Sequence, residues 1–226
     1  VSSYLKTIYS NIATYIPDRY AEGYGVSYKG IDFAHDNDFS LIIALDCGIK
    51  AIEKVAYATK KNIDFIICDH HKPGDKLPKA VAVLNAKRED CSYPFDELCG
   101  CGVGFKLIQA LASKRGQTLE DLTQYLDLVA TAIAADIVPI TGENRILTYF
   151  GLQVINSNPR NGIKAIIQGV KKNILTITDV VFIIAPRINA AGRMKHGNYA
   201  VELLTEMDYE TAISFAASIE KFNIER

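Results

Sequence analysis

The residue types best suited to chemistry stand at the ends of two short apolar runs. Asp69, His70 and His71 follow one run, and Asp46 follows the other. Carboxylate and imidazole groups together suit Mn²⁺, Zn²⁺ or Mg²⁺, and they are the usual ingredients of sites in which two metal ions hydrolyse a phosphoester. These four residues therefore predict a metal site for phosphoester chemistry, provided that the fold brings the two runs together.

The apolar runs themselves, residues 41–45 and 65–68, are short and rich in isoleucine. Such runs are typical of buried strands in a parallel sheet, in which both faces are covered. Residues 49–61 between them have helical apolar spacing and predict a crossover helix, and residues 80–84 are a third candidate strand. Because ligands in open α/β sheets bind beyond the carboxyl ends of the strands, we expect Asp46 and the Asp-His-His triplet to share one edge.

A structural role is the alternative for each of these residues. A lone buried histidine is more often a satisfied core residue than a ligand, and an aspartate after a strand often caps a helix. His70 and His71 cannot both be core residues of one strand, because neighbouring side chains point to opposite faces. The matching position of Asp46 after the other run adds to this argument and favours the metal site.

A further carboxylate, Asp136, closes an apolar helical segment. Burying a carboxylate there is unfavourable unless it is paired or bound to metal. Taken alone, Asp136 could face solvent or cap a neighbouring turn, whereas beside the strand-end residues it is the natural additional metal ligand. Asp127, about two and a half turns earlier in the same predicted helix, is a rival that we expect to lie too far away.

Two segments carry groups suited to phosphate. Arg187, Asn189 and Arg193 present two guanidiniums and an amide within a few residues, and guanidinium forks match phosphate oxygens bidentately. A structural pair of surface arginines is the alternative. Gly102 and Gly104 lie at the start of a predicted helix, where bare N–H groups bind anions. For these glycines we expect mainly close backbone packing beside the metal edge, with phosphate contact as a further role.

The composition is that of an ordered globular protein. Of 226 residues, 49% are hydrophobic and 23% are charged, with a net charge of −1. This balance argues against a uniformly basic nucleic-acid surface but allows a local basic groove. Five cysteines without a secretory segment predict reduced thiols in a cytoplasmic protein. No apolar run approaches the roughly 18 to 20 residues that a membrane span needs.

The expected fold class is α/β, with a parallel sheet and flanking helices followed by a mainly helical C-terminal part. The α/β part covers residues 1–100 and the helical part residues 101–205. Residues 206–226 are expected to begin a helix that connects to a second domain. Helices of the second half are expected over residues 102–114, 119–135, 143–157, 161–169, 177–185, 197–205 and from 208 onward.

Five motifs in fixed order resemble the DHH phosphoesterases, and among them the RecJ-type exonucleases that degrade single-stranded DNA from the 5′ end. They are Asp46-Cys-Gly-Ile, Asp69-His-His-Lys-Pro-Gly, Gly100-Cys-Gly-Val-Gly, Ala135-Asp-Ile-Val-Pro and Pro186-Arg-Ile-Asn-Ala-Ala-Gly-Arg. The loop at residues 18–25 also resembles the RecJ type. This polar, tyrosine-rich loop could stack bases or clamp phosphate, with a purely structural loop as the alternative.

The resemblance implies that residues 1–226 form one DHH phosphoesterase domain of an enzyme in DNA repair and recombination. Two ions of Mn²⁺ or Mg²⁺ would activate a water that attacks the phosphodiester. Single-stranded DNA would be the substrate, with single-strand-binding protein and recombination helicases as partners. The implied catalytic residues are Asp46, Asp69, His70, His71 and Asp136. Of these, Asp46, His71 and Asp136 would hold metal, and Asp69 would orient a histidine. The implied phosphate-binding residues are Arg187, Asn189 and Arg193.

The resemblance also implies segments beyond both ends of this sequence. The family's first aspartate-rich motif would immediately precede Val1, and a second core domain and an oligonucleotide-binding fold would follow Arg226. We therefore expect this chain by itself to bind metal weakly and to be nearly inactive. The alternatives are a DHH phosphodiesterase for oligonucleotides or cyclic dinucleotides, a non-catalytic DNA-binding scaffold, and an inorganic pyrophosphatase.

Overall fold

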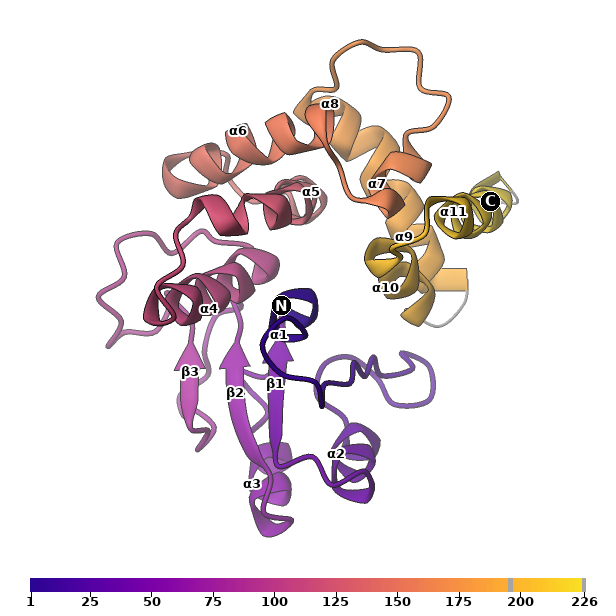
Figure 1. Ribbon diagram of the computed structural model, residues 1–226. Helices are drawn as coiled ribbons and strands as arrows, with labels where there is room; N and C mark the ends of the chain where they lie inside the picture. The colour runs from indigo at the N-terminus through magenta and orange to yellow at the C-terminus, as the bar shows by residue number, and fades with distance from the viewer. Residues whose placement is uncertain (195–196, 225–226) are drawn as a thin grey trace. The chain divides into compact units, whose positions relative to one another are not determined.

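The computed structural model describes residues 1–194 and 197–224, which fall into two compact units. Residues 1–111 form the first unit and residues 112–226 belong to the second. Figure 1 shows the strands within the first unit and a largely helical second unit. Within the described residues, no helix is both long enough and apolar enough to cross a membrane.

The first unit is built on a three-stranded parallel sheet in the order β1-β2-β3. This sheet with its flanking helices confirms the predicted fold class. Apolar side chains from one face of the sheet and from neighbouring helices form a core cluster that includes Ile31, Val55, Phe65 and Ile67. The elements are α1 (Ser2–Leu5), α2 (Tyr28–Asp36), β1 (Leu41–Leu45), α3 (Ile52–Lys60), β2 (Asp64–Cys68), β3 (Ala82–Leu84) and the start of α4 (Gly100–Lys114).

The strand register brings the carboxyl ends of all three strands to one level. Leu45 lies opposite Cys68, and Cys68 lies opposite Leu84. The ladder continues for one more step, because Asp46 N donates to the Cys68 carbonyl at 2.8 Å and Asp69 N donates to the Leu84 carbonyl at 3.0 Å. The side chains that directly follow the strands therefore emerge side by side at one edge.

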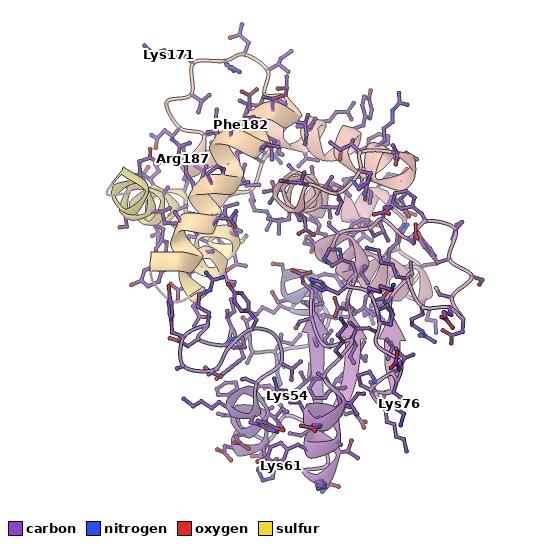
Figure 2. All side chains as sticks on the ribbon, turned by 180° about the vertical axis from the view of Figure 1, so that it is seen from behind. Lys54, Lys61, Lys76, Lys171, Phe182 and Arg187 are labelled. Carbon is purple, nitrogen blue, oxygen red and sulfur yellow. The ribbon has the colours of Figure 1, made fainter. Side chains whose placement is uncertain are left out.

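At the opposite end of the sheet, a lysine links α2 to α3. Lys61 follows α3 and lies at the far end of the unit in Figure 2. Its Nζ is 3.1 Å from the Asp32 carboxylate in α2 and lies over the Tyr57 ring. The Tyr57 hydroxyl also donates to Asp32 at 2.8 Å. These contacts identify Lys61 as a structural cation between the two helices.

The second unit is helical, as predicted. Its core includes Ile155, Ile163, Ile184 and Leu203. Helices α5 and α6 cross closely, since a Cβ on Gly151 would lie 2.3 Å from the Leu126 carbonyl oxygen. The elements are the 3₁₀ helix η1 (Glu120–Tyr125), α5 (Leu126–Asp136), α6 (Gly142–Ser157), α7 (Asn161–Ile166), α8 (Ile177–Asp179), the π-helical η2 (Val180–Ile184), α9 (Ala185–Met194), α10 (Asn198–Thr205) and α11 (Tyr209–Ile224).

The helix expected over residues 177–185 extends further than predicted. In the structure α8, η2 and α9 follow one another without a break up to Met194. Pro186 cannot donate a backbone hydrogen bond and would ordinarily end or kink a helix. The π-helical turn directly before it provides a local change of helical pitch, which is a common way for a helix to accommodate such an irregularity.

Candidate metal centre

Asp46, His70 and His71 meet at the carboxyl edge of the sheet. Each offers one possible ligand atom, and these atoms all lie within 4.8 Å of one another. His70 Nε2 is 3.2 Å from Asp46 Oδ1. The side chains of Asp46 and His71 are each 59% exposed, whereas that of His70 is 12% exposed. A carboxylate and two imidazoles at this spacing could together hold a divalent cation, and the exposed side chains of Asp46 and His71 leave the group accessible from solvent.

Asp69 fixes the position of the His71 ring through a side-chain hydrogen bond. Its side chain is buried and its carboxylate lies 2.6 Å from His71 Nδ1. The backbone N–H groups of Ile49 and His70 also donate to it, at 2.9 and 2.8 Å. Burial by itself would raise the pKa of Asp69, but the hydrogen bonds from Ile49 and His71 hold it below its ordinary value. The ionised carboxylate fixes the ring so that Nε2 is the nitrogen left for a metal ion.

The third strand contributes a residue that the sequence reasoning missed. Asn85 directly follows β3 and is buried. Its Nδ2 donates to the His71 carbonyl at 2.8 Å, and its Oδ1 accepts from Lys87 N at 2.8 Å. Asn85 therefore holds the backbone of the histidine pair. Asn85 directly follows the third predicted strand, just as Asp46 and Asp69 directly follow the first and second. This shared position was the signal in the sequence that could have identified it.

The two aspartates of α5 have different surroundings. Asp136 is the last residue of the helix and is exposed, and Ile137 after it adopts φ 55°. It belongs to the second unit, and its role as a metal ligand stays a prediction. Asp127 is fully buried and accepts from Arg160 Nε and Nη2, both at 2.9 Å. This pairing identifies Asp127 as a structural residue.

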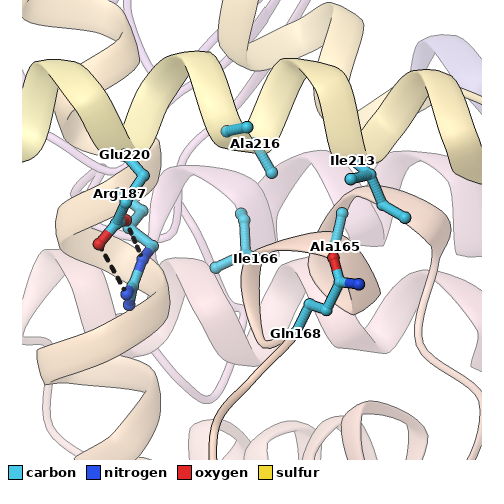
Figure 3. Close-up of a pocket in the computed structure, with 8 residues that line it drawn as sticks. Ala165, Ile166, Gln168, Arg187, Ile213, Ala216 and Glu220 are labelled. Atoms are coloured by element: carbon cyan, nitrogen blue, oxygen red, sulfur yellow. Dashed lines mark hydrogen bonds and ion pairs between the residues drawn. The ribbon is translucent and has the colours of Figure 1, made fainter.

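Arg187, one of the two predicted phosphate-binding arginines of α9, is engaged in an ion pair. Arg187 Nε is 2.6 Å and Nη2 is 3.1 Å from the two carboxylate oxygens of Glu220 in α11. The pair lies at one end of a cavity of about 240 Å³, whose walls include Ile166 and Ala216 (Figure 3). Asn189 is exposed. Arg193 lies in α9, but its side chain is outside the described residues.

The predicted glycines lie near the start of α4 and are buried. Gly102 N donates to Cys99 Sγ at 3.3 Å. A Cβ on Gly104 would lie 3.1 Å from the Val1 side chain and 3.5 Å from that of Leu45. These contacts support the packing role for both glycines, and phosphate contact by them stays a prediction.

The tyrosine-rich loop is ordered around one carboxylate. Glu22 accepts hydrogen bonds from Tyr15 Oη at 2.8 Å and from Ser27 Oγ at 2.7 Å. Around this anchor, the Arg19 guanidinium lies over the Tyr24 ring at 4.7 Å. Tyr20 and Tyr24 are 84% and 77% exposed. The loop thus presents two aromatic faces and a cation to solvent.

The geometry agrees with what comparison with known proteins shows. Residues 1–133 match the model of the DHH family, N-terminal domain. The chain is 39% identical over 224 residues to the single-stranded-DNA-specific exonuclease RecJ of Bacillus subtilis, covering 98% of this chain and 28% of that protein. The chain thus spans about a third of the length of the curated relatives that it matches.

Solved structures show the same likeness. The crystal structure of exonuclease RecJ bound to manganese has a TM-score of 0.89 at 29% identity, covering 99% of this chain and 56% of that one. The structure of RecJ from Thermus thermophilus in complex with Mg²⁺ has a TM-score of 0.64 at 28% identity, covering 82% of this chain and 26% of that one.

Proposed function

The chain belongs to the DHH family, and we propose that it is the phosphoesterase part of a metal-dependent exonuclease that digests single-stranded DNA from the 5′ end in repair and recombination. The observation that carries this proposal is the meeting of Asp46, His70 and His71 at one sheet edge. The RecJ relatives are named for the same substrate, and their solved structures hold manganese or magnesium. Single-strand-binding protein and recombination helicases are proposed partners.

The residues at the edge fit a divalent metal ion. Their donor set combines one carboxylate with two imidazoles, and the ionised Asp69 fixes one of the imidazoles for coordination. Asp46 and His71 would hold Mn²⁺ or Mg²⁺, with Asp136 as a further proposed ligand. When bound, the ions supply an activated water and stabilise charge on the attacking and leaving oxygens. His70, which lies next to Asp46 and is mostly covered, is proposed to orient the scissile phosphate.

Two surfaces are proposed to hold the DNA strand. The exposed Tyr20 and Tyr24 can stack on unpaired bases, since base–aromatic stacking is tolerant of sequence. Arg187, Asn189 and Arg193 are proposed to contact phosphates. For Arg187, this contact requires that phosphate replaces the Glu220 carboxylate, which now occupies both arms of the guanidinium. The net charge of −1 argues against a uniformly basic DNA-binding surface, so binding through a few local contacts of this kind is expected.

Removing the competing carboxylate tests the role of Arg187. Glu220→Gln in the full gene product is expected to tighten binding of a single-stranded oligonucleotide roughly fivefold, which corresponds to about 1 kcal/mol. Fluorescence anisotropy in a chelating buffer measures this affinity without cleavage. Glu210→Gln is the matched control, because it removes the same charge from the first turn of the same helix, whereas Glu220 lies toward the other end. Unchanged binding together with a lower melting temperature would mean that Arg187 only joins α9 to α11.

Substrate preference tests the proposed function itself. The full gene product, supplied with Mn²⁺, is expected to convert a long single strand into mononucleotides from its 5′ end and to leave a blunt duplex intact. A strong preference for dimers to tetramers would instead indicate an oligonucleotide phosphodiesterase. Release of phosphate from pyrophosphate would indicate a pyrophosphatase, and DNA binding without cleavage a scaffold. Each of these three results would overturn the proposal.

A further inference from the structure

We propose that Gly100, the first residue of α4, is a positioning residue that sets the direction of the Asp46 carboxylate; the inference rests on the proposed metal site. A Cβ built on Gly100 would lie 2.1 Å from Asp46 Oδ1, 2.4 Å from its Cγ and 2.6 Å from its Cβ. Atoms that are not bonded to one another do not approach so closely. The carboxylate as placed is therefore compatible only with glycine at position 100.

The oxygen that touches Gly100 is also the one that faces the histidine pair. Asp46 Oδ1 lies 3.2 Å from His70 Nε2. The backbone of Asp46 is fixed as well, because its N–H donates to the Cys68 carbonyl and its φ is 60°. The carboxylate thus lies with an imidazole ring on one side and the backbone of α4 on the other. A methyl group at position 100 would displace the same oxygen that belongs to the donor set.

The burial of Gly100 and of Asp46 indicates which of the two would move if a side chain were added at position 100. Gly100 is buried, and the residues around it that anchor the start of α4, Cys99 and Val103, are buried too. The Asp46 side chain is 59% exposed and can turn toward solvent. Displacing one exposed side chain disturbs much less packing than shifting a fifteen-residue helix. A larger residue at position 100 should therefore alter the metal site more than the fold.

The neighbouring glycine provides a matched control. Gly102 lies in the same turn of α4, and a Cβ there would meet the Leu98 side chain at 3.4 Å, an ordinary contact. Alanine also favours a helix over glycine at both positions to a similar extent. A difference between Gly100→Ala and Gly102→Ala therefore reports the contact with Asp46 and not helix propensity.

Calorimetric Mn²⁺ titration of the full gene product tests the inference. Gly100→Ala is expected to weaken Mn²⁺ binding at least about tenfold, as loss of an outer contact to a ligand does, whereas Gly102→Ala leaves it unchanged. Equal Mn²⁺ affinity of wild type and Gly100→Ala would overturn the inference.

A second measurement applies if the Gly100→Ala protein fails to fold. Asp46→Gly removes the side chain that a methyl group at position 100 would strike, and glycine tolerates the positive φ there. The double variant Asp46→Gly/Gly100→Ala should therefore fold, measured as a cooperative thermal transition, and continued failure to fold would contradict the inference. Absence of Mn²⁺ binding by the wild type would contradict the proposed function instead, so the two failures are distinguishable.

Discussion

In the full gene product, replacing Asp46 by asparagine is expected to reduce the proposed exonuclease activity at least about 100-fold while leaving the melting temperature of the metal-free protein unchanged. Asn is nearly the same size as Asp, and it is among the few residues that adopt the left-handed conformation readily, so the φ of 60° is retained. What is lost is the negative charge. An amide oxygen is a much poorer ligand for a divalent cation than a carboxylate, and loss of bound metal removes the activated water.

Asp38 offers a control with the same backbone conformation. It is exposed, and its φ is 57°. Asp38→Asn therefore makes the same chemical change in the same conformation, away from the strand carboxyl ends, and should alter neither activity nor Mn²⁺ affinity. The measurements are the rate of 5′-labelled single-strand digestion and calorimetric Mn²⁺ titration. Digestion by Asp46→Asn at the wild-type rate would exclude Asp46 from the catalytic site.

The meeting of Asp46, His70 and His71 at one sheet edge could be predicted because the signal is local. Runs of Ile and Leu identify β1 and β2, and a parallel sheet places whatever follows its strands at one edge. The same rule applied to the third strand would have identified Asn85. It was missed because β3 has only three residues, and an asparagine after a strand suggests a turn more readily than a support for histidine.

Contacts between distant segments could not be predicted from patterns. Arg187 and Glu220 are 33 residues apart, as are Asp127 and Arg160, and nothing in a single sequence pairs one charge with another at such separations. The same holds for Gly100. Three glycines begin α4 at alternate positions, and only the structure shows that the first of them lies against a carboxylate. Long-range packing decides the roles of these residues.

The ion pair between Asp127 and Arg160 leads to the largest expected effect on stability. Asp127 is fully buried, and it accepts hydrogen bonds from the Arg160 side chain and from the Leu128 backbone N–H at 2.7 Å. Arg160 Nη1 also donates to the Leu204 carbonyl at 2.9 Å, which links the start of α7 to the end of α10. Removing the guanidinium would leave a buried carboxylate without its counter-charge. Such losses cost about 3–5 kcal/mol.

Arg160→Met is therefore expected to lower the free energy of unfolding by about 3–5 kcal/mol, because methionine preserves the apolar stem but not the charge. Urea denaturation followed by circular dichroism measures the change. The exposed pair Arg88–Asp90 gives the comparison: Asp90→Asn should shift the transition little, since surface pairs are screened by water. Adding Asp127→Leu to Arg160→Met should recover part of the loss, because the unpaired charge is then gone. If Arg160→Met unfolds no more readily than Asp90→Asn, the buried pair does not hold these helices together.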